Sequence, residues 1–169
     1  MLEVGATRLR SLPDTVGPGM RLLVCGLNPS LHSDLGVGFG RKGNRFWPAA
    51  LAAGLVTVDR DARHALTHHG IGMTDLVKRA TTRASELSDA EYRAGVRRVE
   101  WLCRWLRPRA VCMVGMTGWR VAVDPRATAG WQPRELGGAP VYVMPSTSGL
   151  NAHAQLPDLT AHLRAAAGP

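Results

Sequence analysis

The fold is decided by the stretch Arg21-Leu22-Leu23-Val24-Cys25-Gly26-Leu27, which is followed at once by Asn28-Pro29-Ser30. A short apolar run that is closed by an Asn-Pro turn predicts a central β-strand that ends in a turn. Side chains that carry out chemistry in α/β proteins gather where such strands end. We therefore expect residues 28–30 to lie at the functional site.

Outward from this stretch, strands and helices alternate along the chain. The runs 110–115 and 140–144 have the same apolar character and predict two more buried strands, while 71–77 fits either a strand or an extended loop. Capping residues and amphipathic spacing predict helices over 45–53, 59–69, 88–106, 117–123 and 158–167. This alternation predicts a three-layer α/β/α sandwich with a mostly parallel central sheet.

The length of 169 residues and the hydrophobic content of 45% favour one compact domain. We expect residues 20–169 to form it, because residues 1–19 hold two prolines and three glycines without periodicity and predict a loosely packed lead-in. No apolar run approaches the ~20 residues that a bilayer helix needs, and the chain does not start with the apolar core of a secretory signal. We therefore expect a cytoplasmic protein that does not contact membranes.

The net charge is strongly positive, with 21 Lys and Arg against 13 Asp and Glu and a formal value of +8. Such an excess favours polyanionic partners such as nucleic acid, although an Arg-rich composition whose charge is merely solvated explains it equally well. The same two explanations apply to five arginines near one predicted helix: Arg97, Arg98, Arg104, Arg107 and Arg109. On that helix Trp101 and Trp105 lie four residues apart, a spacing typical of the core.

Metal and cofactor sites are not indicated, and we expect neither. The three cysteines, Cys25, Cys103 and Cys112, are irregularly spaced without a Cys-x-x-Cys pair, which favours buried apolar thiols. The glycine-rich stretch 36–40 lacks the spacing of the common nucleotide-binding loops. The pair at 68–69 consists of adjacent histidines at a predicted helix end, where cations are favourable.

Two loops rich in small, hydrogen-bonding residues follow predicted strands, at 26–30 and 144–151. Together with Asn44-Arg45-Phe46-Trp47 and the segment 72–77, they resemble the mismatch-specific uracil/thymine DNA glycosylases of the uracil-DNA glycosylase superfamily. The family signature Gly-[Ile/Leu]-Asn-Pro-Gly is met at 26–29, and its Pro-Ser-Ser/Gly-rich loop is met at 145–150. The resemblance covers most of the chain. It implies a monomeric hydrolase without a cofactor, associated with the nucleoid through its substrate, duplex DNA with a mispaired or deaminated base.

The resemblance assigns the family's catalytic asparagine to Asn28, which would position the attacking water or hydrogen-bond the flipped nucleotide. An amide does not titrate near neutral pH, so Asn28 is no strong base, and Asn-Pro by itself also makes an ordinary turn. Asp75 departs from the family, because several relatives carry lysine or asparagine in this segment. If it faces the pocket, it would activate water or stabilise the cationic sugar; otherwise it caps a helix or pairs with Lys78 or Arg79.

The resemblance also implies a pocket for the flipped base. Its expected residues are Gly26, Leu27, Ser30, Phe39 and Ser146. Ser30 stands where the family has glycine, which narrows the pocket or adds a hydroxyl. A flat apolar ring suits stacking on a pyrimidine, so Phe39 is the candidate for that contact, with a place in the core as the alternative.

The loop after the last predicted strand supplies the expected wedge. Leu150 matches the family position whose side chain fills the gap left by the flipped nucleotide, unless this leucine is tucked under its own loop. Gly149 and Asn151 would then meet the widowed guanine. Ser148, like Ser146, offers a hydroxyl to a phosphate that flanks the lesion.

Three functions are compatible with these features. A glycosylase without lyase activity comes first, because no lysine falls in the two loops to form a Schiff base. A non-catalytic protein that binds mispaired or damaged DNA with the same fold is the second. A small-molecule nucleoside hydrolase is the third, but it would have no use for a wedge or for the charge of +8. The first requires the turns that contain Asn28 and Leu150 to face one crevice.

Overall fold

One five-stranded sheet forms the centre of the computed structural model, which describes residues 11–31 and 36–169. Its strands follow the order β2-β1-β3-β5-β4 and are β1 (Leu22–Gly26), β2 (Ile71–Asp75), β3 (Val111–Val114), β4 (Gly130–Trp131) and β5 (Val141–Met144). The first four strands in this order are parallel, and β4 runs antiparallel to β5. The mostly parallel sheet is confirmed, and the segment that fitted either a strand or a loop begins as a strand.

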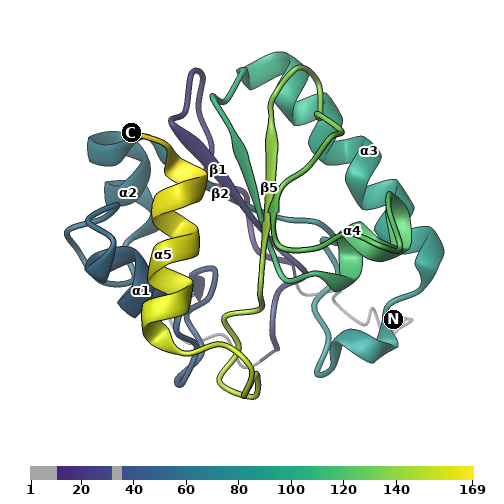
Figure 1. The fold of residues 1–169 in the computed structure, drawn as a ribbon, viewed down its shortest axis with the longest axis horizontal. Helices are drawn as coiled ribbons and strands as arrows, with labels where there is room; N and C mark the ends of the chain where they lie inside the picture. Colours follow the sequence, from purple (N-terminus) through teal and green to yellow (C-terminus); the bar gives the residue numbers. More distant parts are fainter. Residues whose placement is uncertain (1–10, 32–35) are drawn as a thin grey trace, which may run out of the picture.

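Helices cover both faces of this sheet, as Figure 1 shows. One face carries α1 (Phe46–Ala52), α2 (Ala62–His69) and α5 (Leu156–Ala167), and the other carries α3 (Asp89–Leu106) and α4 (Thr117–Ala122). A short 3₁₀ helix, η2 (Ala84–Glu86), precedes α3. The predicted three-layer α/β/α sandwich is therefore confirmed. No helix within the described ranges is long and apolar enough to cross a bilayer.

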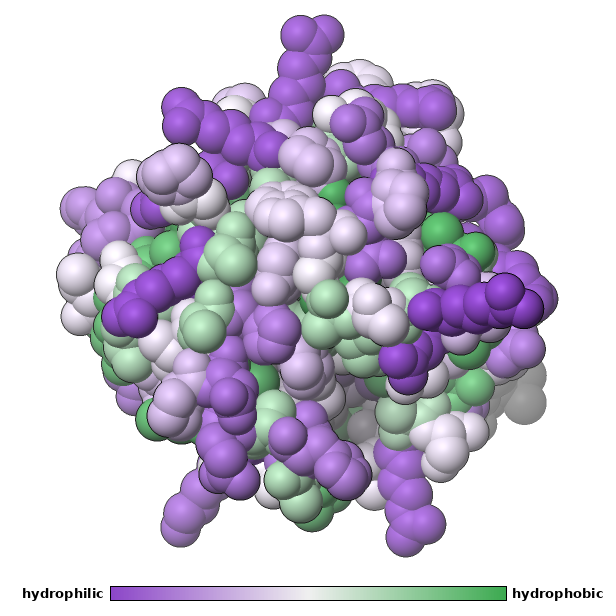
Figure 2. All heavy atoms as spheres, in the orientation of Figure 1, coloured by the Kyte–Doolittle hydropathy of each residue, from purple (hydrophilic) through white to green (hydrophobic). Residues whose placement is uncertain are grey.

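The central strands contribute to two cores, because side chains along a strand alternate between its faces. In β1, Leu22 and Val24 pack on the side of α1 and α5, whereas Leu23 and Cys25 pack on the side of α3 and α4. Each of the four is at most 1% exposed. Burial on both faces explains why this strand is apolar throughout. On the face shown in Figure 2, apolar residues form only small areas, and hydrophilic side chains project around the outline.

Helix α3 turns an apolar stripe toward the sheet and a mixed face toward solvent. The buried stripe consists of Tyr92, Gly95, Val96, Val99 and Cys103. Trp101 and Trp105 lie outside this stripe and are 60% and 77% exposed, so the expected core position of both is wrong. A spacing of four residues defines one side of a helix but does not say which side faces the sheet. In α3, the side that faces the sheet is the one that carries Gly95, Val96 and Val99.

The three cysteines are free and buried, as the sequence predicts. Burial raises the pKa of the Cys103 and Cys112 thiols to about 12 and that of Cys25 well above its usual range. The thiols are therefore protonated near neutral pH. They pack as small apolar side chains in the two cores.

Residues 11–19 are attached to the sheet, which differs from the loose packing expected for residues 1–19. Thr15 and Met73 of β2 form an antiparallel bridge through backbone hydrogen bonds of 2.9 and 2.8 Å. The carboxylate of Asp14 pairs with Lys78 at 2.7 Å and with Arg98 at 2.9 Å. The remainder of the expected lead-in, residues 1–10, lies outside the described residues.

Gly95 should not tolerate a side chain, because α3 approaches the chain directly after β2 at this position. A Cβ atom there would lie 2.2 Å from the carbonyl oxygen of Leu76. Replacing a helical glycine with alanine normally stabilises a protein by roughly 0.5–1 kcal/mol. Here the clash should reverse the sign, so Gly95→Ala should lower the free energy of unfolding by about 1–3 kcal/mol in urea titrations. Arg93→Ala, on the exposed side of α3, should stay within about 0.5 kcal/mol of wild type. A Gly95→Ala protein as stable as wild type would contradict the close approach.

Candidate active site

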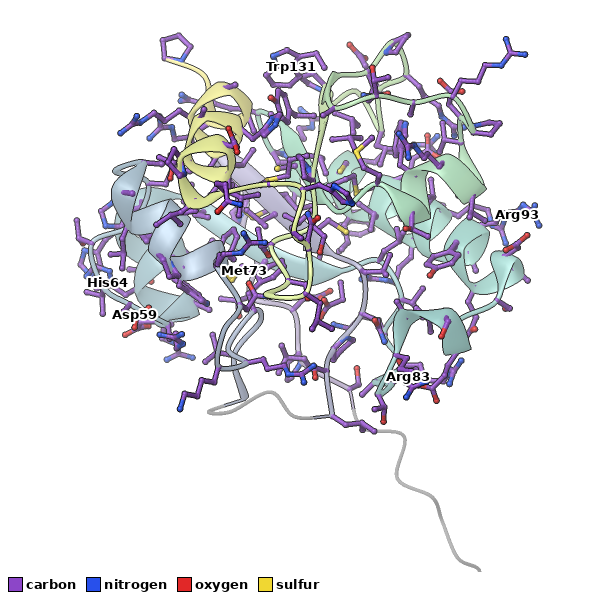
Figure 3. The ribbon with its side chains drawn as sticks, turned by 60° about the horizontal axis from the view of Figure 1, so that its bottom comes forward. Asp59, His64, Met73, Arg83, Arg93 and Trp131 are labelled. Carbon is purple, nitrogen blue, oxygen red and sulfur yellow. The ribbon has the colours of Figure 1, made fainter. Side chains whose placement is uncertain are left out.

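A pocket of about 220 Å³ lies at the edge of the sheet where the parallel strands end. Four residues at or just after these strand ends line it: Gly26 of β1, Asp75 of β2, Val114 of β3 and Ser146 after β5. Because β2 and β3 flank β1 on opposite sides, the loops that leave β1 and β3 diverge and open a crevice between them. Figure 3 brings this edge of the molecule forward, with Met73 of β2 near the centre, between His64 of α2 and Arg93 of α3.

Asn28 lies on the turn directly after β1 and lines this pocket. Its side-chain nitrogen donates to the Arg79 carbonyl at 3.0 Å and to the Thr81 hydroxyl at 2.7 Å. The orientation of the amide is therefore fixed, because a carbonyl can only accept a hydrogen bond. The side-chain oxygen of Asn28 has no hydrogen bond to the part of the chain that the structure describes. It can thus accept a hydrogen bond from a group in the pocket.

Asp75, the last residue of β2, is 8% exposed and lines the same pocket. Burial raises the pKa of its carboxyl group to about 6, against a smaller opposing effect of the Lys78 charge. Within residues 11–31 and 36–169, the carboxylate forms no hydrogen bond or ion pair. Buried carboxylates are normally paired, so one with a raised pKa and no partner in these ranges makes Asp75 a candidate for a functional role.

The cations nearest to Asp75 are bound by another carboxylate. Lys78 and Arg98 both pair with Asp14, and Arg98 also donates to the Thr74 hydroxyl at 2.8 Å and to the backbone carbonyl of Asp75. Burial alone would raise the pKa of Asp14, but hydrogen bonds from Lys78 and Thr74 lower it below its ordinary value. Asp14 therefore forms ion pairs with both Lys78 and Arg98, and neither cation pairs with Asp75.

The other roles considered for Asp75 do not occur among the described contacts. Lys78 is bound to Asp14, and Arg79 pairs with Glu91 at 2.8 Å, so neither neutralises Asp75. Asp75 also caps no helix, since it ends a strand and the next helical turn begins at residue 84. Of the roles considered for Asp75, the geometry agrees with the one in which this residue faces the pocket.

Gly26 leaves space at the pocket for two side chains. A Cβ atom on Gly26 would lie 2.7 Å from a carboxylate oxygen of Asp75 and 3.1 Å from the ring of Phe39. The backbone of Phe39 has a left-handed conformation with φ of 58°, and its ring stacks on Phe46 of α1 with centroids 4.4 Å apart. Phe39 therefore lines the pocket and packs on the core at the same time, so the two positions expected for it are compatible.

The loop after β5 is held by hydrogen bonds along most of its length. The side-chain nitrogen of Asn151 donates to the Ser146 carbonyl at 2.9 Å. The guanidinium group of Arg45, just before α1, donates to the carbonyls of Ser148 and Asn151, both at 2.8 Å. Leu150 is 88% exposed on this fixed backbone and is not tucked under its loop. Its side chain is thus available to an outside partner.

The two loops meet at one crevice. Asn28 and Ser148 line the same pocket, and Ser148 also lines a second hollow together with Gly149 and Leu150. A Cβ atom on Gly149 would lie 2.7 Å from the carbonyl oxygen of Gly43, so the loop rests directly on the chain that precedes α1. The turn that contains Asn28 and the loop that contains Leu150 therefore face the same opening.

The structure adds residues to the pocket that the sequence did not reveal. The expected residues Leu27 and Ser30 do line it, but so do Leu12 of the N-terminal segment and Thr81. The hydroxyl of Thr81 accepts the hydrogen bond from Asn28 and donates to the carbonyl of residue 83 at 2.9 Å. No local pattern marks a threonine six residues after a strand. Thr81 also lies four residues beyond the segment 72–77 that carries the family resemblance, so that resemblance did not reveal it either.

A comparison with known protein families identifies the family that shares this architecture. The family described as the uracil DNA glycosylase superfamily matches residues 13–167 of the chain. The matched range contains all five strands and the helices α1 to α5. It also contains every described residue of the pocket except Leu12. The chain therefore belongs to the uracil DNA glycosylase superfamily.

Proposed function

We propose that this protein is a monofunctional, mismatch-specific DNA glycosylase that removes uracil from G:U mispairs in duplex DNA. Thymine in G:T mispairs is the second candidate base. The observation that supports this proposal most is the meeting of Asn28, Asp75 and the Leu150 loop at one small pocket, in a member of the uracil DNA glycosylase superfamily. Removal of the base would leave an abasic site and start base excision repair.

The size of the pocket supports a single base as its occupant. A volume of about 220 Å³ lies below the roughly 300 Å³ at which pockets for larger ligands begin. A base inside a duplex cannot be reached, so it must rotate out at a cost of a few kcal/mol, which is least at a mispair. The exposed side chain of Leu150 would then fill the space that the base leaves in the stack.

In this proposal Asp75 accepts a proton from the attacking water. The bond between C1′ of the sugar and N1 of the base breaks, and its electron pair leaves with the base. The water oxygen bonds to C1′ while one water proton moves to Asp75 and from there to solvent. A carboxylate with a pKa of about 6 is mostly ionised near neutral pH and is still basic enough for this step. Its charge would also stabilise the cation that develops on the sugar.

Asn28 would position the water or the base rather than take a proton. Both donor positions of its amide are used by Arg79 and Thr81, which leaves the oxygen as an acceptor at the pocket. An amide does not titrate near neutral pH, so it can orient a reactant without changing charge. The two residues would therefore divide the work, with Asn28 orienting and Asp75 receiving the proton.

The same pocket supports the proposal that the protein has no lyase activity. A lyase reaction needs an amine that attacks C1′ and forms a Schiff base. No lysine is found among the described residues that line the pocket. Lys78, the lysine nearest to Asp75 in the sequence, is held by Asp14 and by the Leu12 carbonyl. Water is thus the nucleophile that this site favours.

Labelled duplexes with G:U, G:T or A:U pairs, together with single-stranded uracil DNA, test the proposal directly. Alkali converts each abasic site into a strand break after the incubation. We expect breaks only after alkali, and faster at G:U than at A:U because a mispaired base is easier to flip. Binding without breaks would instead identify a non-catalytic DNA-binding protein. Breaks without alkali would identify a lyase.

Asp75→Ala should lower the single-turnover rate of uracil release more than tenfold and leave duplex binding unchanged, because the carboxylate would act on water and not on DNA. In the wild-type protein, the rate should rise with pH up to about 6 and then level off, because only the ionised form accepts a proton. Quenched reactions across this pH range measure both effects. An unchanged rate in the variant, or a flat pH profile, would rule out this role.

Removal of the Asp75 charge should also stabilise the fold. The folded protein keeps the proton up to about pH 6, whereas an ordinary aspartate releases it near 3.8. Stability is therefore lost as the pH rises between these values, by about 3 kcal/mol in total. Asp75→Asn should recover up to about that amount near neutral pH in urea titrations. Asp14→Asn is the matched control, since the pKa of Asp14 is lowered in the fold and the same change should destabilise. Effects of equal sign in the two variants would contradict this assignment of charges.

Asn28→Ala should slow single-turnover release by about 100-fold or more, as is common when one polar group that stabilises a transition state is removed.

Two variants of Thr81 test whether the fixed orientation of the Asn28 amide matters. Thr81→Ser keeps the hydroxyl that accepts from Asn28 and should stay near wild type. Thr81→Val lacks the acceptor and should lower kcat with little change in KM. Equal kcat values for the two Thr81 variants would show that the hydrogen bond is not needed.

A further inference from the structure

Two tryptophans on the C-terminal half of α3 have no part in the function proposed so far. Trp101 and Trp105 lie four residues apart, so they are neighbours on one side of the helix, and they are 60% and 77% exposed. Apolar side chains that are exposed singly need no explanation, but adjacent ones form a continuous patch that marks a site for a partner. We call this pair the tryptophan ridge.

The tryptophan ridge lies far from the base pocket. Ala84 of η2 lines the pocket, and α3 begins shortly after it. The last residue of α3, Leu106, accepts a hydrogen bond of 2.7 Å from the Gly19 nitrogen, just before β1. The helix therefore runs from the edge of the sheet that holds the pocket to the edge where the strands begin (Figure 1). At about 1.5 Å per residue, Trp105 lies roughly 24 Å along α3 from Asp89.

A hollow of about 360 Å³ lies at the same end of α3. Arg104 and Arg107 line it on the side of the helix, and Gly137 lines it on the side of the loop before β5. This loop rests on the helix backbone, because a Cβ atom on Gly137 would lie 2.6 Å from the carbonyl oxygen of Glu100. The guanidinium group of Arg104 also lies 5.7 Å from the centre of the Trp101 ring. Arg104 thus joins the hollow to the tryptophan ridge.

The surface around the hollow carries more positive charge than the protein neutralises. Among the described residues that line the hollow, none is acidic. The carboxylate of Glu100 is shared by Arg104 at 3.7 Å and Arg134 at 4.0 Å. Arg97 and Arg107 are exposed, and their side chains form no hydrogen bond or ion pair within residues 11–31 and 36–169. This excess of charge favours an anionic partner.

We propose that this surface binds an acidic segment of a partner protein. Apolar side chains of the segment pack on Trp101 and Trp105, and one of its carboxylates enters the hollow between Arg104 and Arg107. Tryptophan and arginine are the residue types that carry much of the binding energy at protein interfaces. Apolar residues one helical turn apart in the segment match the spacing of the tryptophan ridge. The site does not depend on the proposed function, because it lies at the opposite edge of the sheet.

Single-stranded nucleic acid is the other anionic partner that could use tryptophan and arginine together. Such a strand binds along a charged groove that follows its backbone over several nucleotides, with bases stacked on aromatic rings. The tryptophan ridge instead lies on the outer side of one helix, and the hollow lies at one end of it. An anchored carboxylate beside an apolar contact fits this shape better than a long strand does. The geometry therefore favours a protein segment.

Fluorescence anisotropy with three labelled peptides of about 16 residues tests the chemistry of the partner. The first peptide has leucine at every fourth position, with glutamate and alanine elsewhere. The second has lysine in place of each glutamate, and the third has alanine in place of each leucine. We expect the first to bind at least about tenfold more tightly than the others, because only it offers both charge and apolar contact. Equal affinity for the three peptides, or no binding of the first, would overturn the proposal.

Variants of the tryptophans test where the first peptide binds. Trp101→Ala/Trp105→Ala should weaken its binding about tenfold or more, as expected when the central aromatic residues of an interface are removed. The matched control is Trp131→Ala, because Trp131 is 50% exposed but packs on Tyr142, on the side of the sheet that α5 covers. This variant should stay within about twofold of wild type. Equal effects of the two changes would show that the peptide does not bind at the tryptophan ridge.

Variants of the arginines test the hollow. Arg104→Gln/Arg107→Gln should weaken the first peptide about fivefold or more at low salt, and the difference should shrink as salt screens the charges. Arg63→Gln/Arg126→Gln removes the same charge from exposed positions of α2 and of the loop after α4. It should stay within about twofold of wild type. An equal loss in both double variants would reduce the effect to net charge and remove the hollow from the proposal.

Two further measurements distinguish other occupants. If an oligodeoxythymidine binds more tightly than the first peptide and loses affinity in the Trp101→Ala/Trp105→Ala protein, the surface binds nucleic acid and the proposal is wrong. If sedimentation shows a dimer that the same variant dissociates, the occupant is a second copy of this chain. The single-turnover rate of uracil release should be equal in wild type and this variant. If wild type releases no uracil, the proposed function fails, but the peptide measurements still decide this inference.

Discussion

A buried carboxylate at the end of β2, without a hydrogen bond or ion pair to residues 11–31 or 36–169, is the constraint around which the pocket is organised. Asp75 can stay unpaired because Asp14 binds the two nearby cations, Lys78 and Arg98. Asp14 reaches them because Thr15 anchors the N-terminal segment on β2. A segment that contains none of the motif residues thus sets the charge balance of the site. The raised pKa of Asp75 is a property of this whole arrangement and not of the strand end alone.

The loop after β5 shows how a rigid backbone and an exposed side chain can be combined. Arg45 holds the carbonyls of Ser148 and Asn151, and the loop adds hydrogen bonds of its own. Leu150 is consequently presented to solvent by a backbone that is already ordered. In the function we propose, binding would then require little further ordering of the loop, which would reduce the entropic cost of inserting the Leu150 side chain into DNA. The same fixed backbone rests on the chain that precedes α1.

Most of the fold could be predicted, because its signals are local, whereas much of the site could not. Apolar runs located β1, β3 and β5, and the capping box at Ser88 located the start of α3. The edge strand β4 was missed because two residues show no periodicity. Asn28 could be singled out because it follows a predicted strand and matches the family's asparagine. Asp75 could be singled out because a carboxylate is unusual in its segment of the family motif. Thr81 and Leu12 could not, because they reach the pocket only through contacts between distant segments.

The burial of every thiol has a practical consequence for work with this protein. Cys25, Cys103 and Cys112 are held in the interior with pKa values far above neutrality, so oxidants and alkylating reagents meet neither an accessible sulfur nor a thiolate. The native protein should keep without added reductant. Any modification must wait until the sandwich opens, and the rate of alkylation would then count those openings, with the three sulfurs as built-in reporters on both faces of the sheet.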